Sequence, residues 1–170
     1  MWISKDTKHE AFELDEVYWF IKRKERTENR SNIFIMTMIS RMPRQIVGFE
    51  VDNSVNSISL QKIVDSTASA QEYFTDGCSV YLDVIFGGRH RQNFQNKKDT
   101  HNIESTNADL RHYIPGLARR RRCFYRSAET LIAVMSLFVD AYNKFGEAKL
   151  RYRQKFPSAK FIPFSFLDYL

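Results

Sequence analysis

The stretch LDEVYWFI, from Leu14 to Ile21, decides the fold class of this chain. Apart from Asp15 and Glu16, its side chains are apolar or aromatic, which is typical of a central strand buried on both faces of a sheet. Two more runs rich in β-branched residues follow at Ile33 to Ile39 and Gln45 to Val51, and polar turns separate them. The three runs predict an antiparallel meander of three strands.

The middle of the chain predicts a further strand and covering helices. Ser57 to Asp65 has a partly helical spacing of apolar residues that can pack on one face of the meander. Tyr73 to Thr75 is expected to be a short strand that ends at Asp76 and lies parallel to the first strand. Val80 to Phe86 is expected to be helical, and Arg89 to Thr100 polar and irregular.

The second half of the chain predicts two helices and a tail. A helix is expected from about Asn102, with Pro115 kinking or ending it. Ser127 has the character of an N-cap, with Glu129 in the first turn, for a long helix whose apolar residues recur every three or four positions. The expected organisation is an extension at 1–11, one α/β domain at 12–153 and an irregular arm at 154–170.

Composition fits one folded domain with a basic surface. The 170 residues contain 43% hydrophobic residues, and a chain of this size buries about two-thirds of its unfolded surface. The net charge of +6 favours polyanionic partners such as nucleic acid. The most apolar run, Leu131 to Val139, is far shorter than the roughly 20 residues that span a bilayer. Only Cys78 and Cys123 are cysteines, which suits a reducing cytoplasm, so we expect a cytoplasmic protein without a membrane segment.

Three acids stand out by their positions in these elements. Asp15 lies inside a buried strand, Asp76 ends another strand, and Glu104 lies on the polar shoulder of a helix. A parallel strand beside the first would bring Asp15 and Asp76 together, with the helix laid across them. Because close like charges repel and burial disfavours ionised groups, such a cluster makes sense chiefly as a ligand set for cations. Carboxylate oxygens suit Mg²⁺, or Mn²⁺, and two such ions can promote in-line displacement at a phosphodiester.

A plainer interpretation stays open for these acids. The chain contains 20 Asp and Glu residues, and most acids in proteins are solvated or ion-paired. Glu16 is a rival for Asp15, although strand alternation points its side chain to the opposite face of the sheet.

The sequence resembles transposases of the Insertion Sequence One family from about Phe12 to Tyr152. The most specific stretch runs from Thr100 to Ser127, where the matching residues are Ile103, Glu104, Asn107, Leu110, Arg111, Leu117, Arg119, Phe124 and Ser127. The turn Thr75-Asp76-Gly77 with Tyr81 is similar to the family's second aspartate motif, and Asp15-Glu16 followed by Trp19 is similar to the first. The chain departs from the family at Cys78, where an aromatic residue is common.

The resemblance implies a ribonuclease H-like fold, with a mixed sheet of three antiparallel strands plus one or more parallel strands and flanking helices. It implies a DDE triad of Asp15, Asp76 and Glu104, which would hold two Mg²⁺ or Mn²⁺ ions. The implied activity is cleavage at the ends of a bacterial transposon followed by strand transfer into target DNA. Asn107 and Arg111, one and two turns beyond Glu104, would support the site or contact DNA; ordinary surface polarity is the alternative.

A basic segment follows the helix of Glu104. Between Leu110 and Ala128 there are six arginines and no acid. Guanidinium groups pair well with phosphates, so this segment is the expected DNA-binding part of the chain. Its members are Arg111, Arg119, Arg120, Arg121, Arg122 and Arg126.

Two other hypotheses stay open beside the active transposase. The chain could be a truncated, inactive remnant that only binds DNA, or a structure-specific nuclease on the same fold. For an active enzyme we expect double-stranded DNA as partner, both as transposon ends and as target, and a homo-oligomer in the active complex. Family members usually carry a zinc-binding and helix-turn-helix region before the catalytic part, and the resemblance leaves open whether an upstream reading frame supplies such a DNA-binding region as a further partner.

Overall fold

The computed structural model describes residues 9–21, 31–93, 100–117, 125 and 127–170. Its centre is a sheet of five strands in the order β3-β2-β1-β4-β5. The strands are β1 (His9–Ile21), β2 (Ser31–Ser40), β3 (Gln45–Asp52), β4 (Ala70–Thr75) and β5 (Arg89–Gln92). Strands β1, β2 and β3 form the expected antiparallel meander, and β4 lies parallel to β1 as expected. This order and these directions are consistent with a ribonuclease H-like topology.

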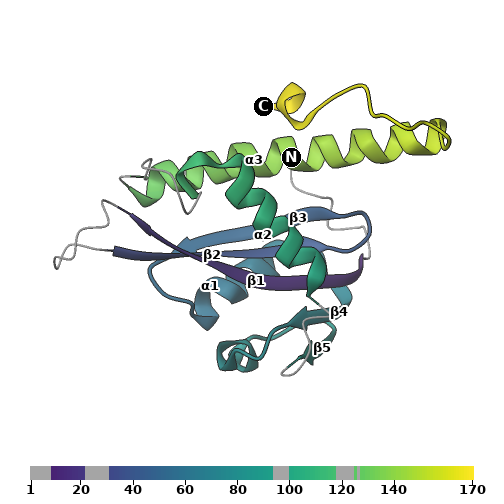
Figure 1. The fold of residues 1–170 in the computed structure, drawn as a ribbon. Helices are drawn as coiled ribbons and strands as arrows, with labels where there is room; N and C mark the ends of the chain where they lie inside the picture. The colour runs from purple at the N-terminus through teal and green to yellow at the C-terminus, as the bar shows by residue number, and fades with distance from the viewer. Residues whose placement is uncertain (1–8, 22–30, 94–99, 118–124, 126) are drawn as a thin grey trace.

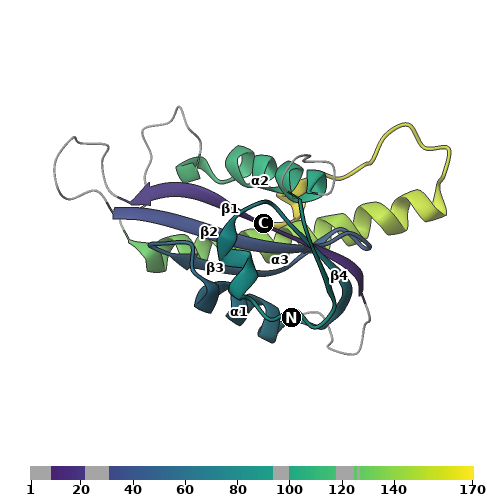
Figure 2. The ribbon, with the colours of Figure 1, turned by 90° about the horizontal axis from the view of Figure 1, so that it is seen from below.

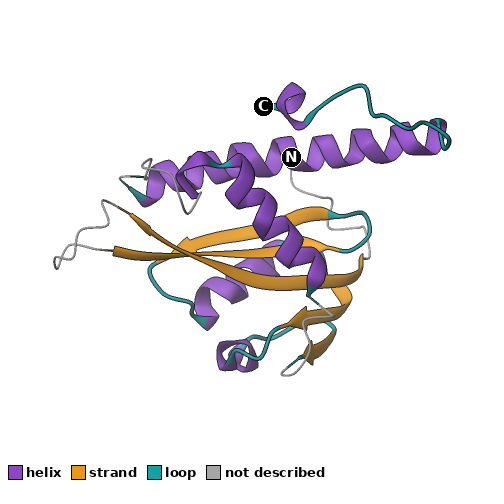
Figure 3. Ribbon diagram, viewed as in Figure 1, coloured by secondary structure: helices purple, strands orange, loops and turns teal. Residues whose placement is uncertain are grey.

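Three α-helices cover the two faces of the sheet (Figures 1 and 3). They are α1 (Ser57–Ser66), α2 (His101–Tyr113) and α3 (Ala128–Lys155). Helix α1 lies against one face, while α2 crosses the other face and α3 runs along it on the β3 side. Figure 2, which turns the molecule by 90°, again places α1 and α2 on opposite sides of the strands.

Strand alternation divides the core into two layers. Phe12 and Leu14 of β1 point into the layer that holds Leu60 of α1. Val17 and Trp19 point into the layer that holds α2 and α3. Because successive side chains of a strand face opposite sides, Asp15 belongs to the α2 side and Glu16 to the α1 side.

The start of α3 and the end of α2 lie where the sequence predicts them. Asn56 and Ser127 cap α1 and α3, each accepting a hydrogen bond from the backbone N–H three residues later. Helix α2 ends at Tyr113, two residues before Pro115, as expected.

Two expectations for the middle of the chain are wrong in part. Arg89 to Gln92, expected to be irregular, forms strand β5, which pairs in parallel with β4. Val80 to Phe86, expected to be a helix, contains only a short 3-10 turn at Ser79–Asp83, here called η1. The strands also begin earlier than expected, since β1 starts at His9 and β4 at Ala70.

The tail folds back over α3 instead of forming a wholly irregular arm (Figure 1). Helix α3 continues to Lys155, and a 3-10 turn forms at Phe166–Tyr169. Phe166 is buried against Phe138 and Tyr113, with ring centroids 5.4 and 4.4 Å away. The tail therefore closes the outer side of the α2–α3 layer.

Among the described residues, no helix combines the length and apolar character that crossing a bilayer requires.

Candidate active site of three carboxylates

Asp15 and Asp76 lie side by side at the centre of the sheet. In the parallel pair β1–β4, Phe12 is opposite Tyr73 and Glu13 is opposite Phe74. The same register, continued by two residues, brings Asp15 next to Asp76, which directly follows β4. The expected pairing of a buried strand with a strand that ends at an acid is therefore present.

Asp15 is held by helix α2. The Asn107 side-chain amide donates a hydrogen bond to Asp15 Oδ2 at 2.9 Å. Asn107 is 3% exposed, and its Oδ1 accepts a hydrogen bond from the Thr37 hydroxyl of β2 at 3.3 Å. Because Thr37 fixes which end of the amide faces Asp15, Asn107 presents a donor to the carboxylate. The structure thus places Asn107 beneath Asp15, in the interior of the domain.

Asp76 sits in a turn that its own carboxylate stabilises. The backbone N–H of Cys78 donates to Asp76 Oδ1 at 2.9 Å. The Gln92 side-chain amide of β5 donates to the Cys78 carbonyl at 2.6 Å, so the last strand supports this turn. Beside it, the Thr75 hydroxyl and His90 Nε2 are 2.8 Å apart. One oxygen of Asp76 is thereby oriented by the backbone.

Glu104 lies in the first turn of α2, and a buried acid on β1 holds this turn. Glu13 Oε2 accepts a hydrogen bond from the Ile103 backbone N–H at 2.8 Å. Glu13 Oε1 accepts from the Asn102 side chain at 2.8 Å and from Arg41 Nε at 2.6 Å. The free N–H groups of a helix N-terminus favour a negative charge, so Glu13 is well matched to this place.

The turn between β2 and β3 also holds the start of α2. Arg44 donates from Nη2 to the Asn102 carbonyl at 3.2 Å and to the Thr106 hydroxyl at 3.1 Å. Arg44 therefore holds the end of the helix that carries Glu104 directly, and Arg41 of the same turn holds it through Glu13.

The three acids influence one another electrostatically. Burial raises the pKa of Asp15 above its ordinary value of 3.8, and the negative charges of Asp76 and Glu104 raise it further. Hydrogen bonds from the backbone and from Asn107 oppose this rise. Repulsion from both partners means that Asp76 and Glu104 lie within electrostatic range of Asp15.

Glu16 occupies the other face of the sheet, as strand alternation predicts. Burial raises its pKa to about 7, and the charges of Asp15 and Asp76 add to the rise. Its Oε2 accepts a hydrogen bond from the Tyr81 hydroxyl at 2.8 Å. Tyr81 is fully buried, and burial followed by the charge of Glu16 raises the pKa of its hydroxyl. Glu16 and Tyr81 thus form a pair beneath the acids.

The chemistry of this donor set fits a hard divalent cation. Three carboxylates from β1, the end of β4 and α2 offer the oxygen ligands that Mg²⁺ and Mn²⁺ prefer. In the part of the chain that the structure describes, no three His, Cys, Asp or Glu side chains stand close enough around one point to coordinate an ion. Among the described residues, Asp15, Asp76 and Glu104 therefore interact electrostatically but do not form a cluster that encloses an ion.

The expected DNA-binding residues are divided by the structure. Arg111 lies in the last turn of α2 and is half-buried. The remaining members of the basic segment, Arg119, Arg120, Arg121, Arg122 and Arg126, lie outside the described residues, as does Cys123.

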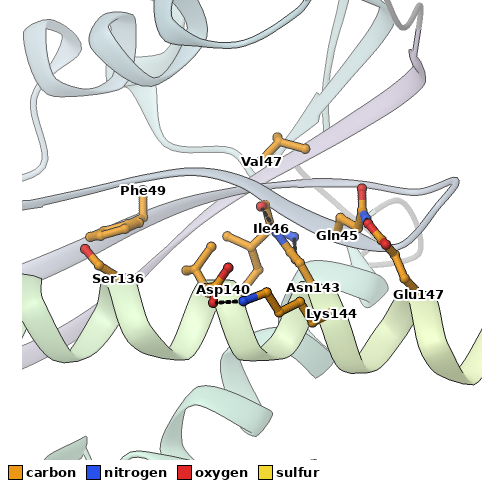
Figure 4. A pocket seen from close by; sticks show the side chains of 10 residues that line it. Gln45, Ile46, Val47, Phe49, Ser136, Asp140, Asn143, Lys144 and Glu147 are labelled. Atoms are coloured by element: carbon orange, nitrogen blue, oxygen red, sulfur yellow. Dashed lines mark hydrogen bonds and ion pairs between the residues drawn. The ribbon is translucent and has the colours of Figure 1, made fainter. Parts of the chain in front are cut away.

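A separate hollow lies between β3 and α3, and none of the three acids lines it (Figure 4). Its volume is about 420 Å³. On its floor the Asn143 side chain of α3 bonds both backbone groups of Ile46, accepting from N–H and donating to the carbonyl, each at 2.9 Å. Glu147 accepts a hydrogen bond from Gln45 at 2.8 Å beside it. These contacts fix α3 to the free edge of the sheet.

Sequence reasoning missed Glu13 and Thr37, and it named Tyr81 only as part of the second aspartate motif. Glu13 shares a face with Asp15 by alternation, so extending the predicted strand upstream would have found it. Thr37 gave no such signal, because its role depends on its contact with α2, and the pairing of Tyr81 with Glu16 likewise depends on a contact across the fold.

A scan against protein-family models finds no match for this chain, and a search of curated proteins finds no significant match.

Proposed function

We propose that this chain is the catalytic part of a DNA transposase of the DDE kind, built on a ribonuclease H-like fold. The observation that carries the proposal is the placement of Asp15 beside Asp76 on parallel strands, with Glu104 on the helix above them. The resemblance to the Insertion Sequence One family supports the same three residues. The basic composition suits double-stranded DNA as transposon end and as target.

Asp15, Asp76 and Glu104 would together hold two Mg²⁺ or Mn²⁺ ions. A bound pair of such ions supplies activation of the attacking oxygen and stabilisation of the leaving oxygen in a phosphodiester displacement. The repulsion that raises the pKa of Asp15 also favours cation binding, because a cation relieves it.

Two of the three carboxylates have a partner that would orient them toward the ions. Asn107 donates to one oxygen of Asp15, and the Cys78 N–H donates to one oxygen of Asp76. Partners of this kind keep ligands in a productive orientation and support the ionised form. The chain would first use water to cut the transposon end, and then position the 3′-hydroxyl for attack on target DNA.

The test is cleavage and joining of DNA duplexes that carry the sequences flanking this protein's gene. With Mg²⁺ or Mn²⁺, the wild-type protein should nick these duplexes and join them to a plasmid. Asp76→Asn should reduce both reactions by about a thousandfold or more, the scale at which a site loses an essential charge. Asp83→Asn, which changes an exposed acid on η1, is the matched control and should keep activity.

The outcomes separate the hypotheses. Nicking without joining would indicate a nuclease, and salt-sensitive DNA binding without any metal-dependent reaction would indicate an inactive remnant. Wild-type activity in a folded Asp76→Asn protein would refute the proposed site.

A further inference from the structure

Glu13 is the most completely buried acid near the site, and it lies one strand repeat before Asp15. Its side chain has no exposed surface. A buried carboxylate is costly unless it is paired and hydrogen-bonded. Glu13 meets this requirement through Arg41, Asn102 and the Ile103 N–H, which together give each of its oxygens at least one hydrogen bond.

The partners of Glu13 either belong to the helix that carries Glu104 or contact the strand that precedes Asp76. On one side they are the first residues of α2, directly before Glu104. On the other side is Arg41, whose guanidinium lies 3.8 Å above the ring of Phe74, two residues before Asp76. Glu13 itself is two residues before Asp15 on the same face of β1. One carboxylate thus links β1, β4 and α2.

We infer that Glu13 is a positioning residue that sets the height of Glu104 above Asp15 and Asp76 by anchoring the first turn of α2. The inference rests on the proposed function for the role of the three acids, but the anchoring itself does not. The packing of α2 alone would allow it to slide or fray at its first turn, where helices are least held. A charged acceptor on the rigid central strand removes this freedom.

Glu13→Gln is the sharpest variant, because it preserves shape and removes the charge. A carboxamide has one acceptor oxygen and one donor nitrogen. It can satisfy either Ile103 N–H or the pair Arg41 and Asn102, and its NH₂ then faces a donor. The first turn of α2 loses an acceptor in either orientation. Glu72→Gln is the matched control, since Glu72 on neighbouring β4 bonds Arg91 at the surface at 2.5 Å.

Hydrogen exchange of backbone amides measures the anchoring without any activity. In chelator, Glu13→Gln should accelerate exchange in the first turn of α2 by about tenfold or more, as expected for losing a buried hydrogen bond to a charged group. Exchange in α3 should stay at the wild-type rate, and Glu72→Gln should match wild type throughout. Unchanged exchange in α2 would overturn the inference. If Glu13→Gln does not fold, Asn102→Ala removes one helix donor and leaves the Glu13–Arg41 pair intact; it should accelerate the same amides.

Binding of Mn²⁺, followed by electron paramagnetic resonance, measures the consequence for the site. At a temperature where both proteins are folded, Glu13→Gln should bind Mn²⁺ at least about tenfold more weakly than wild type, the scale seen when a partner of a metal ligand is lost. Faster exchange with unchanged Mn²⁺ affinity would overturn the positioning role. If the wild-type protein binds no Mn²⁺, the proposed function fails; faster exchange then still supports the anchor, and unchanged exchange still overturns it.

Discussion

Glu16 and Asp15 are neighbours in the chain, yet the sheet separates their surroundings. Asp15 faces α2 and accepts a hydrogen bond from Asn107, whereas Glu16 faces η1 and accepts one from Tyr81. Burial raises the pKa of both, and for Glu16 to about 7. A carboxyl group with a raised pKa in the folded state stabilises the fold only while it is protonated.

The stability of the protein in chelator should therefore depend on Glu16. Its contribution is fully present below its ordinary pKa of 4.5 and is lost as the pH rises through about 7. Glu16→Gln keeps an acceptor for Tyr81 and removes the charge. It should match wild type near pH 4 and exceed it at about pH 8, by an amount on the order of 1–3 kcal/mol.

Urea unfolding at several pH values measures this difference. Asp83→Asn, which changes an exposed acid, should show no such pH-dependent gain. A Glu16→Gln protein that is less stable than wild type at both pH values would contradict the raised pKa.

At the scale of elements, α3 protects the free edge of the sheet. Among the described residues, β3 is the last strand on its side, so one row of its backbone groups lacks a neighbouring strand there. Asn143 bonds both backbone groups of Ile46 in place of a strand, and Glu147 holds Gln45 next to it. The long helix is thereby fixed to the edge by polar contacts as well as by its apolar face.

Asn143→Ala should lower the free energy of unfolding by about 2–4 kcal/mol, because two hydrogen bonds to backbone groups are lost and these groups keep no protein partner. Urea unfolding checks the value. Ser136→Ala is the control on the same helix, since its hydroxyl bonds only the carbonyl of Ile132 one turn earlier. Equal stability of Asn143→Ala and Ser136→Ala would show that the edge contact contributes little.

Elements with a clear apolar period were predictable from the sequence, and those that depend on partners were not. The meander, α1 and the cap Ser127 follow local patterns that act within a few residues. Strand β5 has the sequence Arg89-His90-Arg91-Gln92, which is polar at every position. It is a strand because β4 offers it an unpaired edge, and no local pattern reports that.

The residues of the candidate site also fall into two groups, those that local sequence indicates and those that depend on distant partners. Asp15 and Asp76 were predictable because an acid in or at the end of a buried strand is unusual. Glu13 lies in the same strand, but its partners Asn102 and Ile103 are 89 and 90 residues away. Only the fold reveals that this acid is satisfied by a helix end instead of by water.

At the scale of the whole molecule, the sheet and the helix that crosses it bring together acids from distant parts of the chain. Parallel pairing of β1 with β4 joins two of them, and α2 crosses the same face with the third. The helices α1 and α3 cover the sheet, and none of the three acids lies on them. The proposed function therefore requires that Asp15, Asp76 and Glu104 bind divalent cations jointly.

Calorimetric titration with Mn²⁺ measures this property most directly. The wild-type protein should bind Mn²⁺, and each of Asp15→Asn, Asp76→Asn and Glu104→Gln should weaken binding by at least about tenfold while the protein stays folded. The exposed control Asp83→Asn should bind as wild type does. Undiminished Mn²⁺ binding in all three folded variants would contradict the shared site.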